Sequence, residues 1–370
     1  MKFKSISIKD GRTGWNVDNI QFNPMLTLLV GASGVGKTKI LNGINALKQI
    51  ARGNSFFGLE WKTEFVQEGH VYIWEGEFEA TDVLKSSYLE ENRTGFSIVR
   101  ESISDNGESL VVRTQEKLVY KQQELVKLDN TKSVIELLKE ESSVKPIHNG
   151  FQQCYFIDTV DNAIHVSNIV NVSRRNPFNF KLIKQLNMFT LLDRFYLLYE
   201  NHLDEFNLIC RKFQDIFPTV QELGFALVKA NDNLVFPVLR IKEKNVAAWI
   251  EQTEISSGMM RTLQQIITLV LANDGDVIMI DEFENGLGVN CINELADLIM
   301  EPEADIQVVM TSHHPYIINA IPVKDWKILT RNGSDVHVHT AEELHIGEHS
   351  KHEAFMQLLQ TREYKTGTRN

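Results

Sequence analysis

The sequence predicts an α/β protein whose core is a mainly parallel sheet with helices on its faces. Apolar segments typical of buried strands alternate with helical patterns in residues 1–52 and again in residues 254–340, and such alternation is typical of parallel sheets. A glycine-rich loop, 31-GASGVGKT-38, connects an apolar segment to a helical pattern. Neither region has enough strands for a sheet of its own, so we expect the two regions to share one sheet.

The composition indicates a globular protein. Of the 370 residues, 43 % are hydrophobic and 24 % are charged. No apolar run reaches the roughly 18–20 residues of a membrane helix, and the start, MKFKSISIKD, lacks the apolar core of a signal peptide. Cys154, Cys210 and Cys291 show neither paired nor metal-type spacing, which suits a reducing compartment. We therefore expect a cytoplasmic protein with buried, unpaired cysteines.

Residues 1–52 predict a strand, a turn, a second strand, the glycine-rich loop and a helix. Residues 3–8 alternate with period two, and residues 26–30, LTLLV, form a continuous apolar run, as a central parallel strand should. Apolar residues at helical spacing follow the loop, and Gly53 is placed to end that helix.

Residues 53–253 are expected to form an inserted arm with an antiparallel β subdomain and a helical subdomain. The strands are expected at residues 71–80, 95–103, 109–120 and 154–160, and the helices at 132–141 and 180–213. No sustained heptads are present, so we expect no long coiled coil. Residues 341–370 are expected to be a polar, partly frayed C-terminal tail.

The loop matches the pattern G-x-x-x-x-G-K-[ST] at every fixed position, between a strand and a helix as this phosphate-binding motif requires. Its backbone N–H groups would surround phosphates at the positive end of the helix. Lys37 would reach the β- and γ-phosphates, and Thr38 would ligate Mg²⁺. The predicted nucleotide-binding residues here are Gly31, Ser33, Gly34, Gly36, Lys37 and Thr38.

A second motif consists of the apolar segment 277-VIMI-280 followed by Asp281 and Glu282. Such a strand places its acidic residues at the carboxyl edge of the sheet, where open α/β sheets bind ligands. Asp281 is therefore a candidate Mg²⁺ ligand. Glu282 is a candidate catalytic base for the water that attacks the γ-phosphate.

Two further motifs narrow the class of P-loop protein to which the chain can belong. Ser256, Ser257 and Gly258 precede a predicted helix over residues 259–272, where the serines either only cap the helix or help to form an anion site. His313, in 311-TSHHP-315, follows a strand over residues 306–311. It is either a packed turn histidine or a contact to the γ-phosphate.

In this order the four motifs resemble the ABC-type ATPase heads of the SMC-like and OLD (overcoming-lysogenization-defect) ATPases, particularly the compact forms without a long coiled coil. The resemblance implies that Ser256–Gly258 is a variant of the ABC signature, that 284-ENGL-287 is the D-loop, and that His313 is the switch histidine. The segment 217-FPTV-220 also resembles one that these heads carry before the signature.

The resemblance implies ATP and Mg²⁺ as ligands and a dimeric mechanism. Two heads would sandwich two ATP molecules, with the P-loop of one chain facing Ser256, Ser257 and Gly258 of the other. We therefore expect a homodimer or higher homo-oligomer, with Glu282, His313 and Lys37 as its catalytic residues. Closure with ATP and loosening after hydrolysis would make it a clamp or switch.

The sequence departs from the family pattern at three places. Gly288-Val289 stands where the D-loop usually continues with His-Pro, and two methionines follow Gly258. No evident Q-loop glutamine follows the predicted strand 154–160. The candidates for that role are Asp158, Asn162, Gln67, Gln152 and Gln153.

Three functions fit these observations. No TOPRIM nuclease domain follows His313, so by fold-level analogy we expect a stand-alone ATPase that acts on DNA or controls a separate nuclease or toxin, in anti-phage defence or DNA maintenance. The alternatives are an ATP-binding scaffold with little turnover and an ABC transporter subunit, although the β-rich insertion disfavours a transporter.

Two local features leave alternatives open. The basic cluster of residues 174–194 either contacts a DNA backbone or is a solvated face, and the net charge of −11 excludes only a protein that binds nucleic acid over its whole surface. Trp15, after Arg12, either stacks on adenine or packs in the core.

Overall fold

The computed structural model describes residues 1–80, 95–126, 128–157, 164–175, 177–186, 188–231, 234–347 and 351–368. These residues form two compact units. The first comprises Met1–Ile157, Gly275–Phe283 and Asp305–Asn370, and the second comprises Asp158–Asp274 and Glu284–Ala304. Each unit is described by itself.

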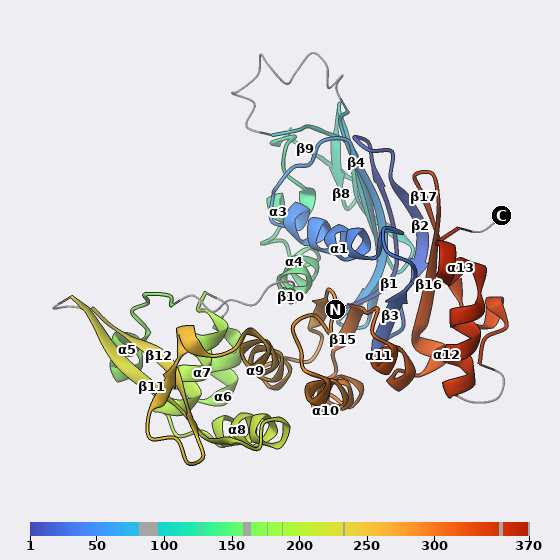
Figure 1. Cartoon of the computed structure of the whole chain (residues 1–370). Helices are drawn as coiled ribbons and strands as arrows, with labels where there is room; N and C mark the ends of the chain where they lie inside the picture. Colours follow the sequence, from blue (N-terminus) through green and yellow to red (C-terminus); the bar gives the residue numbers. More distant parts are fainter. Residues whose placement is uncertain are drawn as a thin grey trace, which may run out of the picture. The chain divides into compact units, whose positions relative to one another are not determined.

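The first unit is built on one mixed sheet of 14 strands (Figure 1). Its parallel part has the order β10-β14-β15-β3-β16. These strands are β10 (Cys154–Ile157), β14 (Val277–Ile280), β15 (Gln307–Thr311), β3 (Leu26–Val30) and β16 (Trp326–Asn332). Every residue of β14, β15 and β3 is buried, as expected for parallel strands covered on both faces.

The remaining strands continue this sheet in the order β17-β2-β1-β4-β5-β6-β7-β8-β9. All neighbours in this part pair antiparallel except β17 and β2, which pair in parallel. The strands are β17 (Asp335–Thr340), β2 (Asn16–Gln21), β1 (Lys2–Asp10), β4 (Leu59–Gln67), β5 (His70–Phe78), β6 (Ile98–Asp105), β7 (Glu108–Thr114), β8 (Leu118–Tyr120) and β9 (Gln123–Leu125).

This continuity differs from the predicted boundary at residue 52. β4 pairs with β1 from Lys2↔Val66 to Asp10↔Leu59, so the strands β4 to β9 extend the sheet of the P-loop unit and are not a separate arm. The alternation of β4 buries Trp61 and Phe65 on the inner face of the sheet. The α/β fold is thus confirmed, and the sheet consists of a parallel part followed by a mainly antiparallel part.

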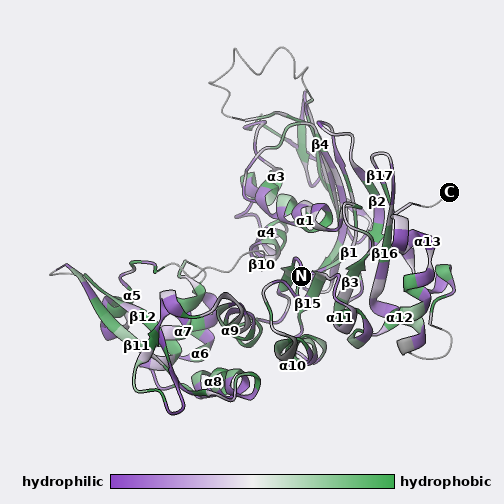
Figure 2. Cartoon of the chain, viewed as in Figure 1, coloured by the Kyte–Doolittle hydropathy of each residue, from purple (hydrophilic) through white to green (hydrophobic). Residues whose placement is uncertain are grey.

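Helices cover the sheet of the first unit. Figure 1 shows α1, α3 and α4 beside the sheet, and α12 and α13 beside β16. The bounds are α1 (Lys37–Ala51), α3 (Val134–Leu137), α4 (Lys145–Gln152), α11 (Pro315–Ala320), α12 (Lys351–Gln360) and α13 (Arg362–Thr366), with 3-10 turns η2 (Val323–Asp325) and η3 (Glu342–Leu344). Hydrophobic and hydrophilic residues alternate along α1 (Figure 2), and its apolar face is buried in the main core.

Two predictions for this unit were wrong. The helix expected at residues 132–141 is the four-residue α3. The C-terminal tail is not frayed over its described residues, because α12 and α13 contact each other and α13 contacts β16. Ala354 and Leu358 of α12 are fully buried, so a few apolar side chains anchor a polar segment.

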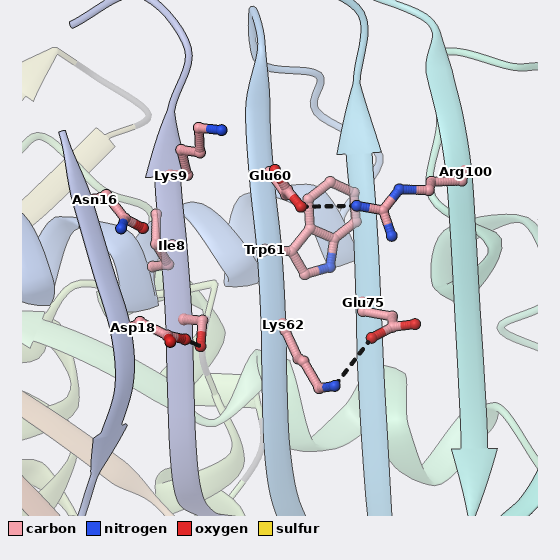
Figure 3. A pocket seen from close by; sticks show the side chains of 10 residues that line it. Ile8, Lys9, Asn16, Asp18, Glu60, Trp61, Lys62, Glu75 and Arg100 are labelled. Carbon is pink, nitrogen blue, oxygen red and sulfur yellow. Dashed lines mark hydrogen bonds and ion pairs between the residues drawn. The ribbon is translucent and has the colours of Figure 1, made fainter. Parts of the chain in front are cut away.

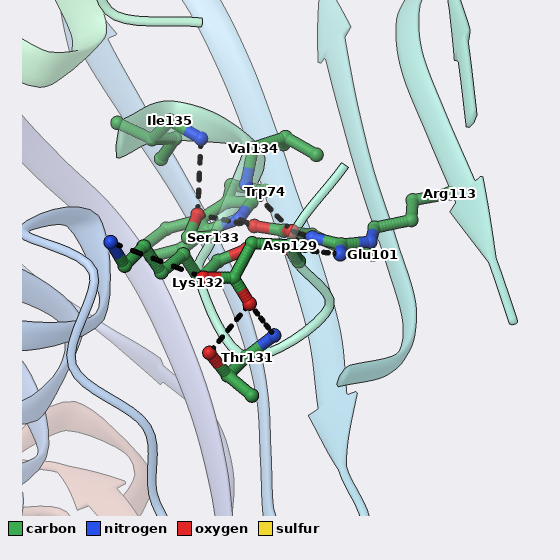
Figure 4. A network of polar contacts seen from close by, with 9 residues as sticks. All are labelled: Trp74, Glu101, Arg113, Asp129, Thr131, Lys132, Ser133, Val134 and Ile135. Carbon is green, nitrogen blue, oxygen red and sulfur yellow. Dashed lines mark hydrogen bonds and ion pairs between the residues drawn. The ribbon is translucent and has the colours of Figure 1, made fainter. Parts of the chain in front are cut away.

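A buried polar network ties β5, β6 and α3 together (Figure 4). Glu101 is 1 % exposed and accepts hydrogen bonds from Trp74 Nε1, Ser133 Oγ and the backbone N–H of Val134. Arg113 lies nearby, with Nη1 3.8 Å from Glu101 Oε2. Burial raises the pKa of the Glu101 carboxyl.

The outer face of the antiparallel strands is charged but internally neutralised. Figure 3 shows Lys62 of β4 directed toward Glu75 of the neighbouring β5, and Arg100 of β6 reaching across β5 to Glu60 of β4. The pairs are at 3.4 Å and 2.7 Å, respectively. A hollow of about 330 Å³ lies on this face. Because acidic and basic side chains pair with one another, the described part of this face shows no excess of positive charge for a nucleic acid.

The second unit combines helices with a small antiparallel sheet of three strands in the order β11-β12-β13. The helical run predicted at residues 180–213 is three helices, because Asn179 and Thr190 cap α6 and α7 and Leu203 precedes α8. The elements are α5 (Ile169–Arg175), α6 (Phe180–Gln185), α7 (Leu191–Glu200), α8 (Asp204–Ile216), β11 (Val220–Asn231), β12 (Leu234–Glu243), β13 (Trp249–Glu251), η1 (Gln252–Glu254), α9 (Ser257–Val270) and α10 (Val289–Met300). Within the described ranges, the chain has no helix with the length and apolar character needed to cross a membrane.

Candidate functional site

The P-loop lies between the end of β3 at Val30 and the start of α1 at Lys37. Gly31, Gly34 and Gly36 have φ values of +150°, +83° and +111°, which residues other than glycine rarely adopt. At Gly36 a Cβ atom would also lie 3.0 Å from Trp15 Nε1. Trp15 is 3 % exposed, so its ring packs beneath the loop, in agreement with the packing alternative.

Lys37 is held inside the loop. Its Nζ donates to Gly31 O at 2.8 Å and to Ala32 O at 3.0 Å, and the residue is 6 % exposed. The ammonium group is therefore bent back over the loop that is predicted to surround the phosphates.

A short chain of hydrogen bonds connects the P-loop to the acidic pair. Thr38 Oγ1 donates to Asp281 Oδ1 at 3.1 Å, and Thr311 Oγ1 donates to the same oxygen at 2.7 Å. The backbone N–H of Glu282 donates to Thr311 Oγ1 at 2.7 Å. Glu282 has φ +45°, a left-handed conformation that costs a non-glycine residue free energy, and the bond to Thr311 holds the turn in place.

Thr38, Glu282 and Thr311 lie at a pocket of about 270 Å³. It is lined by Ser33, Gly34, Gly36, Lys37, Thr38, Lys39, Glu282, Thr311, His313 and Arg331. Glu282, His313 and Lys37 thus line one pocket, and Thr38 and Asp281 are in contact. The parallel arrangement of β14, β15 and β3 explains this, because their carboxyl ends meet at one edge of the sheet.

A more apolar pocket of about 430 Å³ shares Lys39 with the first one. Lys39 Nζ lies 5.5 Å from the centroid of the Trp15 ring. The remaining lining includes Asp10, Arg12, Asn42, Phe56, Phe57 and Phe96. Aromatic walls beside the P-loop suit a flat, partly apolar group.

Ser256, Ser257 and Gly258 belong to the second unit. Ser256 caps α9 by accepting a hydrogen bond from Met259 N at 3.3 Å, and Ser257 is exposed at the first turn. A Cβ atom on Gly258 would lie 2.5 Å from Gly286 O. The signature-like segment and the D-loop-like segment therefore touch within this unit.

The glutamines proposed for the Q-loop do not lie at the carboxyl edge of the sheet. Gln152 and Gln153 precede β10, and Gln152 accepts a hydrogen bond from Arg52 Nε. Gln67 ends β4 and is buried. The edge itself is reached after Ile157, whose carbonyl accepts from Asp281 N, so these three glutamines are excluded as sensors there. Asp158 and Asn162 lie outside the described residues.

Sequence reasoning missed three residues of this pocket, Lys39, Thr311 and Arg331. Lys39 directly follows the P-loop motif. Thr311 was part of a recognised motif, but its hydrogen bonds depend on the register between β14 and β15. Arg331 follows the apolar run of β16 and donates from Nη1 to Gly34 O at 3.2 Å. The sequence signal that could have indicated Arg331 is a charged residue directly after the buried residues of a strand.

Comparisons with known proteins agree with this geometry. Residues 26–319 match the family described as "AAA domain, putative AbiEii toxin, Type IV TA system". No curated protein matches the chain. A crystal structure of the SmcHead bound to the C-winged helix domain of ScpA is 14 % identical with a TM-score of 0.50, and the match covers 92 % of this chain and 98 % of that one.

Two further solved structures are similar over 92 % of this chain. The SMC head domain from Thermotoga maritima has 12 % identity and a TM-score of 0.45 over 99 % of its length. The Smc head domain with an extended coiled coil from Pyrococcus furiosus, bound to the C-terminal domain of ScpA, has 13 % identity and a TM-score of 0.43 over 97 %.

The SmcHead match confirms the predicted fold, that of an SMC-like ATPase head. The family match extends over most of the described sheet and over the P-loop, the acidic pair and His313. The chain therefore belongs to the AAA_21 family of P-loop ATPase domains.

Proposed function

We propose that this protein is a Mg²⁺-dependent ATPase of the ABC type that works as an ATP-controlled switch. The observation that carries the proposal is the hydrogen-bonded series Thr38, Asp281, Thr311 and Glu282 at the mouth of the P-loop. The series contains the groups that phosphoryl transfer to water uses: a hydroxyl and a carboxylate that suit a metal ion, and a second acidic residue that suits the attacking water.

The donor set fits a magnesium ion. Thr38 Oγ1 and Asp281 Oδ1 are 3.1 Å apart, and Mg²⁺ in nucleotide sites takes one or two protein oxygens and completes its octahedron with phosphate and water. When bound there, Mg²⁺ would neutralise phosphate charge. Lys37, which now donates to Gly31 O and Ala32 O, would exchange these carbonyls for phosphate oxygens.

Glu282 supplies the base. Its carboxylate lines the phosphate pocket together with His313, and a water between Glu282 and the γ-phosphate would lose its proton to that carboxylate as its oxygen attacks phosphorus. ADP leaves with the electron pair of the broken bond. His313 would hold the γ-phosphate oxygens during this step.

The aromatic pocket beside the P-loop accommodates the nucleoside. Phe56, Phe57 and Phe96 supply apolar surface, and Asp10, Arg12 and Asn42 supply polar groups. Because Lys39 lines both pockets, one ligand with a base at one end and phosphates at the other would fill both.

Ser257 is exposed, and Gly258 lies against Gly286. Both observations support a nucleotide site that the signature-like segment of a second copy of the chain completes. In this proposal Ser256, Ser257 and Gly258 of one chain bind the γ-phosphate held by the P-loop of its partner. ATP closes the homodimer and hydrolysis reopens it. Related heads occur in complexes, since the SmcHead is bound to a ScpA domain.

The switch is proposed to act on DNA or on a separate effector such as a nuclease or toxin, in OLD-like antiviral defence or DNA maintenance in the cytoplasm. Arg174, Arg175 and Lys181 are exposed in the second unit, which supports a local contact to a phosphate backbone. On the outer face of the sheet, by contrast, the described Lys62 and Arg100 are paired with carboxylates.

The test is phosphate release from Mg-ATP, with and without double-stranded DNA, by the wild type, by Glu282→Gln and by Lys37→Ala. We expect Glu282→Gln to lower turnover by at least about 100-fold and to retain ATP binding, and Lys37→Ala to lose both. Glu282→Gln turnover equal to the wild type would overturn the assignment of the base. ATP binding without any hydrolysis by the wild type would instead identify a scaffold.

A further inference from the structure

Arg331 is a basic residue of the phosphate pocket that lies far from the P-loop in the sequence and outside the four motifs. β16 runs parallel to β3 with Ile328 opposite Val30, so Arg331 lies beyond the end of β3, level with the P-loop. Its side chain lines the pocket together with Lys37 and His313.

The guanidinium is oriented by two backbone carbonyls. Nη1 donates to Gly34 O at 3.2 Å and Nε donates to Gly333 O at 2.6 Å. A guanidinium has five N–H donors, and these two bonds leave the others for a ligand. Arg331 forms no ion pair with any carboxylate among the described residues.

The C-terminal segment supports this position. The backbone N–H of Arg331 donates to Gly367 O at 2.6 Å, and Gly367 ends α13 with φ +67°. A Cβ atom on Gly367 would lie 2.6 Å from Val35 Cγ1 and 3.2 Å from Ala32 Cβ. The end of α13 therefore contacts the P-loop and the strand that presents Arg331.

We propose that Arg331 binds a phosphate of the nucleotide in its own chain and that the end of α13 at Gly367 holds Arg331 and the P-loop in register. This inference rests on the proposed function, because it assigns a further residue to the same nucleotide site. The planar fork of arginine suits two phosphate oxygens at once. The hydrogen bond from Arg331 Nη1 to Gly34 O couples the proposed phosphate contact of Arg331 to the conformation of the P-loop.

The experiment compares Mg-ATP, Mg-ADP and AMP binding by isothermal titration for the wild type, Arg331→Gln and Arg331→Lys. The control is Arg100→Gln, the same substitution on the outer face of the sheet. We expect Arg331→Gln to weaken ATP binding by at least about tenfold and AMP binding much less. Arg331→Lys should lie in between, because lysine keeps the charge without the fork.

The proposal would be overturned if Arg331→Gln bound ATP as tightly as both the wild type and the control Arg100→Gln. If Arg331→Gln unfolds, Arg331→Lys is measured in its place. An affinity of Arg331→Lys for ATP equal to that of the wild type would contradict a bidentate contact. A wild type that binds neither ATP nor ADP would instead overturn the proposed function itself.

A second variant tests the support from α13. Gly367→Val touches no ligand but would drive a side chain into Val35 and Ala32, so we expect weaker ATP binding without loss of the fold by circular dichroism. The matched control is Gly107→Val in the first unit, where a Cβ meets nothing within 4 Å and φ is also positive, at +86°. Equal ATP affinity of both variants would overturn the role of Gly367.

Discussion

Thr311 Oγ1 donates to Asp281 Oδ1 at 2.7 Å. The same hydroxyl accepts from the backbone N–H of Glu282 at 2.7 Å, and Thr311 is 1 % exposed. One buried hydroxyl therefore fixes both the carboxylate proposed to bind the metal and the strained turn that presents the proposed base.

We predict that Thr311→Val, which keeps the shape and removes the hydroxyl, lowers the kcat of ATP hydrolysis by about 10- to 100-fold. The KM for ATP should change little, because the P-loop remains intact. Thr311→Ser is the control, since it keeps the hydroxyl and should retain most activity. Equal kcat for the valine variant and the wild type would show that the hydroxyl does not position the acids.

The signature-like segment predicts an ATP-dependent dimer. In a Glu282→Gln background, which should trap bound ATP, we expect the mass measured by light scattering to double on addition of Mg-ATP. Ser257→Arg in that background should keep the protein monomeric. Ser257 is exposed and Ser256, not Ser257, caps α9, so the variant should fold normally.

Gln221→Arg is the matched control for this experiment, because it adds the same side chain at another exposed position of the second unit. It should still dimerise. Dimerisation of the Ser257→Arg protein to the same extent would contradict the proposed sandwich.

The buried Glu101 predicts a pH-dependent contribution to stability. Burial raises the pKa of its carboxyl, so the folded chain holds this proton more tightly than the unfolded chain. The contribution of Glu101 is then largest at low pH and falls as the pH rises from the unfolded toward the folded pKa. We predict that Glu101→Gln lowers the melting temperature by a few degrees, roughly 1–3 kcal/mol of stability, and by more at pH 5 than at pH 8.

Differential scanning fluorimetry at both pH values checks this prediction. Glu77→Gln, on the exposed outer face beside Arg100, should change the melting temperature little at either pH. A difference between wild type and Glu101→Gln that is constant with pH would show that the carboxyl does not change its protonation on folding.

The cysteines are predicted to be unreactive in the folded protein. Burial raises the pKa of the Cys154 thiol to about 12 and that of Cys210 to about 12, and Cys291 is 1 % exposed. At pH 8 the thiolates of Cys154 and Cys210 are then a negligible fraction, and burial shields Cys291 from the reagent. Iodoacetamide followed by peptide mass spectrometry should label none of the three without denaturant and all three in guanidinium chloride, and native labelling of Cys154 would contradict its burial.

The parts of the site that follow from local pattern were predictable. The P-loop and the pair Asp281 and Glu282 each follow a short apolar strand. Parallel topology brings the carboxyl ends of these strands together. His313 follows from the same rule. These features depend on a few neighbouring residues and on one topological principle.

The parts that depend on strand register were not predictable. Residues 53–157 read as an insertion because nothing local to β4 shows that it pairs with β1. Thr311 and Arg331 reach the pocket only through the pairings of β15 with β14 and of β16 with β3. The C-terminal helices were missed because few of their side chains are apolar.

The pairing between β17 and β2 has a mechanical consequence. Only Asp335↔Asn16 and Val336↔Val17 are in register there, whereas β16 and β17 pair over six positions and β1 and β4 over eight. This two-residue ladder joins the strands beside the P-loop to strands that wall the proposed nucleoside pocket. Because so few backbone pairs hold this seam, we expect a bend of the sheet to concentrate there.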